Sequence, residues 1–319
     1  MSILAPRACR PLIGFANLGD LMRVVALCAG VCLMASSHLP AAAERGPVVA
    51  LNHFFVVVDA PTYEAARASP FLTREWAPFE ARTTVRNDTS YTGSYWYGRR
   101  TYFELFEPGA QGPVGASGLA LGVEEPEGSA AVRQHWQDAL ATAGGGLVTR
   151  KTEADEVPWF EMTYAREIPG LRVWLMEYHR DFLARWYGTL TRARSITRAD
   201  VLDRYVAKIG QSERRQTALL KDVVGLTIAI APTEREALVK QLRAVGWLAQ
   251  DEAGAVVCLG PEPGQLRLVA PKRGRTGIVA VDFSLQHPVA KASHRIGSAE
   301  LQLEGASASL LLVSASVSH

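Results

Sequence analysis

The chain has 319 residues, with 34 lysines and arginines against 32 aspartates and glutamates, and a formal net charge of +2. Nothing in this near balance favours nucleic acid or an anionic membrane as a partner, so we expect no nucleic-acid ligand. With 48% hydrophobic residues, the chain is long enough to bury one large core or two small ones.

Residues 1–43 have the pattern of a signal peptide. Arg23 precedes an apolar run over residues 24–34, and three alanines at 41–43 form a cleavage site. Met22 is the better start, because it gives a compact charged region before the apolar run. That run is shorter than the roughly 20 residues that cross a bilayer, so we expect no stable membrane anchor. The mature protein is therefore expected to be exported, either periplasmic or secreted.

Cysteine usage agrees with a core held together by burial. Three of the four cysteines lie within the predicted signal, and only Cys258 remains in the mature chain. A single cysteine cannot form an internal disulfide, so stability must come from packing.

One pattern occurs three times after the signal: a strand-like apolar run, a helix that starts with a proline, and further strand-like runs. The prolines are Pro61, Pro126 and Pro232. A helical stretch over 181–216 lengthens the gap between the second and third copies. We predict an α+β fold of repeated βαβββ units forming cupped mixed sheets, with a helical insert before the last unit.

The predicted boundaries follow from this repeat. The first unit covers 44–117, the second 118–180, the insert 181–216, and the third unit 217–319, which ends in a closing hairpin. The strands expected after the helices lie at 83–85, 91–97, 101–106, 147–150, 159–164, 171–178, 255–259, 265–269 and 277–285, with the hairpin at 299–303 and 307–313.

Two short motifs carry a resemblance to a known superfamily. They are Leu51-Asn52-His53-Phe54 in the first strand of unit one and Tyr102-Phe103-Glu104-Leu105-Phe106 in its last strand. With the repeated unit, they resemble the vicinal oxygen chelate superfamily of glyoxalase I, bleomycin-resistance proteins and extradiol dioxygenases. The resemblance covers most of residues 48–285 and implies two units that cup their sheets around a metal site. The run from 51 to 104 also resembles a group of uncharacterised exported bacterial proteins, which implies no activity.

The resemblance implies a set of metal ligands. His53 and Glu104 would come from unit one and Glu177 from unit two, with His179 added because residues two apart on a strand share a face. One or two imidazoles and two carboxylates suit Zn²⁺, Mn²⁺, Ni²⁺ or Fe²⁺ with open positions for a substrate. Unit two has Gly118 where unit one has His53, so the set departs from the four-ligand glyoxalase pattern. The alternatives are a hydrogen-bonded core histidine and a Glu104 that pairs with a neighbouring arginine.

Aromatic and basic side chains of unit one are candidates for substrate binding. Tyr95, Tyr97 and Tyr102 could line an apolar pocket between the cupped sheets. Arg82 and Arg86 could hold a carboxylate or phosphate group of the ligand. Core packing is the alternative for the tyrosines, and a solvated strand face is the alternative for the arginines.

Three functions remain open at this point. The first is an exported glyoxalase-like lyase, isomerase or dioxygenase with a divalent metal and a small-molecule site between units one and two. The second is a protein of the same fold that binds or sequesters a small molecule without turning it over. The third is a structural role in which His53 and Glu104 pair with other side chains.

Overall fold

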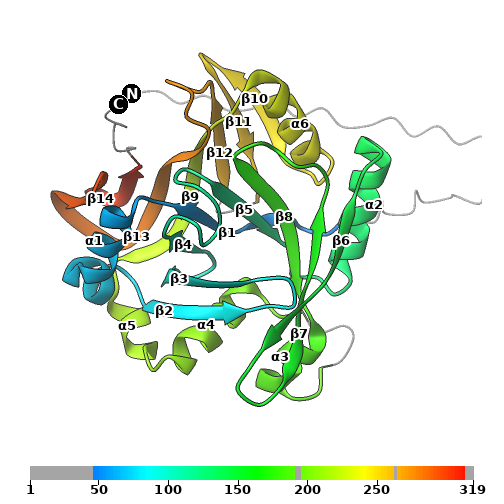
Figure 1. The fold of residues 1–319 in the computed structure, drawn as a ribbon, viewed down its shortest axis with the longest axis horizontal. Helices are drawn as coiled ribbons and strands as arrows, with labels where there is room; N and C mark the ends of the chain where they lie inside the picture. Colours follow the sequence, from blue (N-terminus) through cyan, green and yellow to red (C-terminus); the bar gives the residue numbers. More distant parts are fainter. Residues whose placement is uncertain (1–45, 191–194, 262–263, 313–319) are drawn as a thin grey trace, which may run out of the picture. The chain divides into compact units, whose positions relative to one another are not determined.

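The first two predicted units share one sheet in the computed structural model, which describes residues 46–190, 195–261 and 264–312 (Figure 1). The signal expected over 1–43 lies outside the described residues. No helix within these ranges is long and apolar enough to cross a membrane. The elements of unit one are β1 (Ala50–Val57), α1 (Ala60–Ala68), a π-helical turn (Phe71–Trp76), β2 (Phe79–Val85), β3 (Ser90–Tyr97) and β4 (Tyr102–Phe106).

Unit two and the insert follow in the predicted order. Unit two contains β5 (Ser117–Gly122), α2 (Gly128–Leu140), β6 (Gly144–Lys151), β7 (Glu156–Tyr164) and β8 (Leu171–Tyr178). The insert contains α3 (Arg180–Tyr187), α4 (Arg198–Lys208) and α5 (Ser212–Thr217). A capping box between Thr197 and Asp200 starts α4, because each side chain bonds the other residue's backbone N–H.

The eight strands of units one and two form a sheet in the order β2-β3-β4-β1-β5-β8-β7-β6. Each unit pairs its first strand in parallel with its last, and the two first strands, β1 and β5, run antiparallel at the seam. An isolated bridge between Arg86 and Arg150 brings the edges near β2 and β6 together, so the sheet curls around one face. The predicted α+β class with cupped mixed sheets is confirmed.

The last part of the chain forms a second sheet in the order β10-β11-β12-β9-β13-β14. Its elements are β9 (Leu220–Ala229), α6 (Pro232–Arg243), β10 (Leu248–Glu252), β11 (Ala255–Leu259), β12 (Gln265–Val269), β13 (Gly277–Ile296) and β14 (Ala299–Leu311). Strand β10 was not predicted, because its residues are mostly exposed and polar, and β13 was predicted as one of the strands of unit three. Instead β13 pairs antiparallel with β9, as β5 does with β1, and forms one long hairpin with β14.

Two cores hold these layers together. The larger core joins the outer face of the first sheet to the second sheet and to α1, α2 and α6, with Phe103 against Phe283 at 5.6 Å between ring centroids. The smaller core joins the curled face of the first sheet to the insert, through residues such as Tyr97 and Tyr205, whose rings stack at 6.2 Å. The curled face is called the concave face below.

Candidate functional site

The concave face collects the candidate residues of unit one. Cross-strand partners lie on the same face of a sheet, and His53 pairs with Tyr102 while Phe55 pairs with Glu104. Tyr95 and Tyr97 pair with Glu104 and Tyr102 from the next strand. The structure thus brings together His53, Glu104, Tyr95, Tyr97 and Tyr102.

A β-bulge at Asn52 sets the direction of His53. Leu51 pairs with Leu121 and His53 with Ala120, so the register shifts by one residue between them. Asn52 and His53 therefore reach one another although they are neighbours in the chain, and Asn52 Oδ1 lies 2.9 Å from His53 Nδ1. The amide oxygen of Asn52 can only accept a hydrogen bond, so Nδ1 of His53 carries the proton. Nε2 is then unprotonated, and its lone pair can accept a hydrogen bond or bind a metal.

His53 is packed between aromatic rings. Its imidazole stacks on Tyr102 at 4.3 Å between centroids and meets the edge of Trp174 at 5.4 Å. Burial, with a smaller contribution from the charge of Arg82, lowers the pKa of His53 from 6.5 to about 3. The ring is therefore neutral at physiological pH.

Glu104 lies next to this imidazole, with 3.8 Å between its Oε1 and His53 Nε2. Burial raises the pKa of Glu104 from 4.5 to about 8, against the opposing charges of Arg82 and Arg86. At neutral pH the group is mainly a carboxylic acid that faces the lone pair of a neutral imidazole. The expected ion pair with Arg99 or Arg100 is absent among the described residues, because Arg100 pairs with Asp222 and Arg99 bonds Gln216 and Gln286.

The arginines proposed to hold a ligand's anionic group have carboxylate partners of their own. Arg82 donates to Glu80 at 2.6 Å and to the Tyr97 hydroxyl at 2.6 Å, and its guanidinium lies 3.9 Å from the centre of the Tyr95 ring. Arg86 makes two hydrogen bonds to Asp88, at 2.8 and 2.7 Å. These bonds position the arginines within the protein and leave less of their charge for a ligand.

Glu177 does not join the site. Along β8 the residues on the concave face are Trp174, Met176 and Tyr178, since Trp174 pairs with Ala120, the partner of His53. Glu177 therefore lies on the outer face, where it accepts hydrogen bonds from the backbone N–H groups of Glu127 (2.8 Å) and Ser129 (2.9 Å) at the start of α2. It stabilises a helix N-terminus that has no side-chain cap of its own.

His179 also has a structural position. It follows β8 as the N-cap of α3, and its Nδ1 accepts a hydrogen bond from the Asp181 backbone at 3.3 Å. The prediction that Glu177 and His179 face His53 and Glu104 was wrong, because matching the strand ends of the two units put Glu177 in place of Trp174, an offset of three residues. An odd offset reverses the face just as a shift of one residue does.

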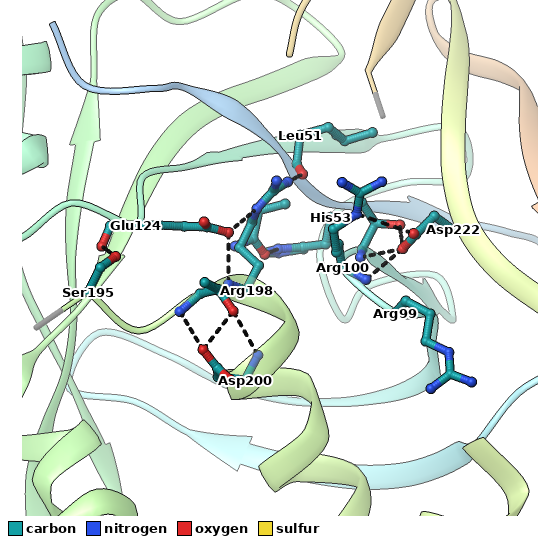
Figure 2. A network of polar contacts seen from close by, with 12 residues as sticks. Leu51, His53, Arg99, Arg100, Glu124, Ser195, Arg198, Asp200 and Asp222 are labelled. Atoms are coloured by element: carbon teal, nitrogen blue, oxygen red, sulfur yellow. Dashed lines mark hydrogen bonds and ion pairs between the residues drawn. The ribbon is translucent and has the colours of Figure 1, made fainter. Parts of the chain in front are cut away.

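Two anchors that the sequence analysis missed hold the strands of the site (Figure 2). Arg198 of α4 pairs with Glu124 at 2.9 Å and donates to the carbonyl oxygen of Leu51 at the bulge. Asp222 of β9 accepts from the backbone N–H of Arg100 (2.6 Å) and of Thr101 (3.0 Å), just before β4. The insert thus fixes the strand of His53, and the second sheet fixes the strand of Glu104. Buried polar side chains far apart in sequence gave no local signal for these contacts.

The donor set does not fit a metal held by three or more protein groups. Within the ranges that the structure describes, no group of three His, Cys, Asp or Glu side chains is placed to hold a metal ion. Of the four predicted ligands, all of which the structure describes, His53 Nε2 and Glu104 alone converge, and the positive charges of Arg82 and Arg86 act on the same carboxyl group. A cation would therefore meet two ligands and unfavourable electrostatics.

A cavity of about 1040 Å³ opens at the other side of Trp174. Its lining includes Phe55, Trp174, Met162 and the segment 112–117. The Phe55 and Trp174 rings lie 6.1 Å apart, and Trp174 also contacts His53. Phe55 and Trp174 thus form an apolar floor between the cavity and the His53–Glu104 pair. An apolar, aromatic lining is typical of small-molecule sites.

The raised pKa of Glu104 predicts a specific pH dependence of stability. Between pH 4.5 and about 8, the folded protein keeps a proton that the unfolded chain has lost. The free energy of unfolding of the wild type should therefore fall with rising pH, relative to Glu104→Gln, by at most about 1.4 kcal/mol per pH unit. Urea unfolding of both proteins at pH 5, 6, 7 and 8 measures this difference.

The matched control is Glu107→Gln, which replaces an exposed carboxylate three residues away. Its difference from the wild type should stay constant over the same pH range. Parallel pH curves for the wild type and Glu104→Gln would contradict the buried, protonated state of Glu104.

Comparison with known proteins supports the fold and the family. A hypothetical protein from Staphylococcus aureus is 10% identical with a TM-score of 0.52, and the match covers 81% of this chain and 99% of that chain. An Mn(II)-bound glyoxalase from Novosphingobium aromaticivorans is 9% identical with a TM-score of 0.39, covering 81% and 78% of the two chains. BphC, a halotolerant catechol dioxygenase, is 6% identical with a TM-score of 0.39, covering 82% and 84%.

At these identities the similarity to solved structures concerns the fold alone. No curated protein matches the sequence. A family of unknown function, DUF5829, matches residues 51–311, which is most of the chain. The chain therefore belongs to the DUF5829 family.

Proposed function

We propose that this protein is an exported, glyoxalase-like binding protein that takes a small, largely apolar molecule in the cavity beside Trp174, which the first two units line together with residues 274–276 of the third. The observation that carries the proposal is the aromatic floor of the cavity beside Trp174. Aligning Pro61 with Pro126 matches Phe55 to Ala120, and their parallel partners are Glu104 and Trp174. Unit two thus has an indole where unit one has a carboxylate, which favours contact with an apolar ligand over coordination of a metal.

The polar pair behind this floor agrees with an apolar ligand. His53 and Glu104 do not line the cavity, and both are neutral at physiological pH. The aromatic floor therefore has no buried charge behind it that would disfavour an apolar molecule.

Removal of the indole tests the binding proposal. In the wild type, the neutral fluorescent probe N-phenyl-1-naphthylamine should bind in the cavity, and Trp174→Ala should weaken binding by roughly tenfold because it removes aromatic contact area. Trp174→Phe should retain most of the affinity. Fluorescence titration gives the dissociation constants, and thermal melts show that each variant is folded.

Leu248→Ala is the control for non-specific binding, because Leu248 is 72% exposed and lies outside the cavity. It should leave the probe affinity unchanged. Equal loss in Leu248→Ala, or no loss in Trp174→Ala, would contradict a binding site beside Trp174.

A divalent-metal lyase, isomerase or dioxygenase is the second candidate. The observation that favours it is the tautomer of His53, whose Nε2 lone pair lies 3.8 Å from Glu104. A hydrogen bond that fixes the opposite ring nitrogen is common in metal-binding histidines. Zn²⁺, Mn²⁺, Ni²⁺ and Fe²⁺ are the ions to test, because they accept nitrogen and oxygen ligands.

Melting experiments separate the two candidates. The binding proposal predicts the same melting temperature for wild-type protein with chelator and with each added ion, because two ligands near two arginines hold a cation weakly. A rise in the wild type that Glu104→Gln abolishes would support the metal enzyme. Elemental analysis of protein purified from its natural host provides an independent reading of metal content.

Export is the part of the proposal that rests on the sequence of residues 1–43. The charged residue, apolar run and alanine site support cleavage after Ala43. Expression of the full chain in a bacterial host, followed by N-terminal sequencing of the periplasmic fraction, should give a sequence that begins at or near Glu44. A mature protein that keeps residues 1–21, or that carries a lipid on Cys28 or Cys32, would contradict this prediction.

A further inference from the structure

The rim of the cavity beside Trp174 has an uneven distribution of charge. Three arginines line it, together with one exposed and one half-buried glutamate. They are Arg166, Arg172, Arg275, Glu167 and Glu234. Whether the cavity attracts a charged ligand depends on which of these arginines already have a carboxylate partner.

Arg275 has no such partner. It is half-buried, and its guanidinium donates to the carbonyl oxygen of Leu312. Burial lowers the pKa of Arg275, and no acidic group opposes this shift. Across the described part of the chain, no ion pair involves this residue. A partly buried cation without an anion is costly, and an anionic ligand would offset that cost.

Arg172 has a neutral partner as well. It donates from Nη1 to Gln111 Oε1 at 2.9 Å, and both residues line the cavity. Arg166 differs, because its charge acts on Glu234, whose carboxylate also accepts from the Thr233 hydroxyl at 2.6 Å. Within the described ranges, Arg172 and Arg275 therefore line the cavity without a carboxylate partner.

We propose that the ligand of this cavity is a planar, mainly apolar molecule with one anionic group, of the class of aromatic carboxylates. Its ring system lies against Phe55 and Trp174, and its anionic group accepts hydrogen bonds from Arg275 and Arg172. Charge-assisted hydrogen bonds from guanidinium groups suit carboxylates in particular. This inference rests on the proposed function, since it names the ligand class of the same site.

A pair of probes isolates the anionic group. 8-Anilinonaphthalene-1-sulfonate and N-phenyl-1-naphthylamine share one ring system and differ only by the sulfonate. Arg275→Gln and Arg172→Gln should each weaken binding of the sulfonate probe by roughly tenfold, the value expected for one lost charge-assisted hydrogen bond. Both variants should leave the affinity for the uncharged probe within about twofold of the wild type.

Lys272→Gln is the matched control, because it removes one positive charge from the same loop at an exposed position outside the cavity lining. It should leave both affinities unchanged, and an equal loss of sulfonate binding there would show a non-specific charge effect and overturn the inference. If both probes depend on Trp174 but neither arginine variant discriminates between them, the anionic ligand class is wrong while the binding site stands. If neither probe depends on Trp174, the proposed function fails, and the inference fails with it.

Discussion

The antiparallel pairing of β1 with β5 is the contact on which the site depends. It joins the first strands of two units in one sheet and puts the concave faces of both units on the same side. The pairing also places Gly118 opposite Phe55. A Cβ atom at Gly118 would collide with the Phe55 ring and lie 2.7 Å from the Trp174 ring, so any larger residue there requires the aromatic floor to move. A histidine at this position and the Phe55–Trp174 floor are therefore mutually exclusive.

The strands that carry His53 and Glu104 are held from outside their own unit. The bulge at Asn52 frees the Leu51 carbonyl from regular pairing, and Arg198 of the insert satisfies it from a buried position beside Glu124. The carboxylate of Glu124 balances the charge of the buried guanidinium, and the Leu51 carbonyl accepts one of its N–H groups. Both partners together fix the position of the Arg198 side chain. The insert is thus part of the site architecture, because it fixes the bulge that turns His53 toward Glu104.

Much of the fold could be predicted from the sequence because it depends on local patterns. Apolar runs, prolines and the spacing of the repeats indicated the βαβββ units, and unit one placed His53 and Glu104 on adjacent strands. Unit two failed at Glu177, because strand parity changes with a single residue and no local pattern marks where a strand's register begins. The strand β10 was missed since exposed polar residues hide its pattern. The anchors Arg198 and Asp222 act across more than 100 residues of sequence, a separation at which spacing carries no information.

The electrostatics of the concave face differ from those of the cavity rim. Inside, burial favours the uncharged forms of His53 and Glu104, so a cation entering there would need Glu104 to ionise in a surrounding that resists it. At the cavity on the other side of Trp174, Arg172 and Arg275 have no carboxylate partner among the described residues. For the proposed ligand, the anionic group would be recognised at the cavity rim, where water still reduces the cost of desolvation, and the ring system against the aromatic floor. As a neutral pair beside Tyr102 and Trp174, His53 and Glu104 are buried at little electrostatic cost.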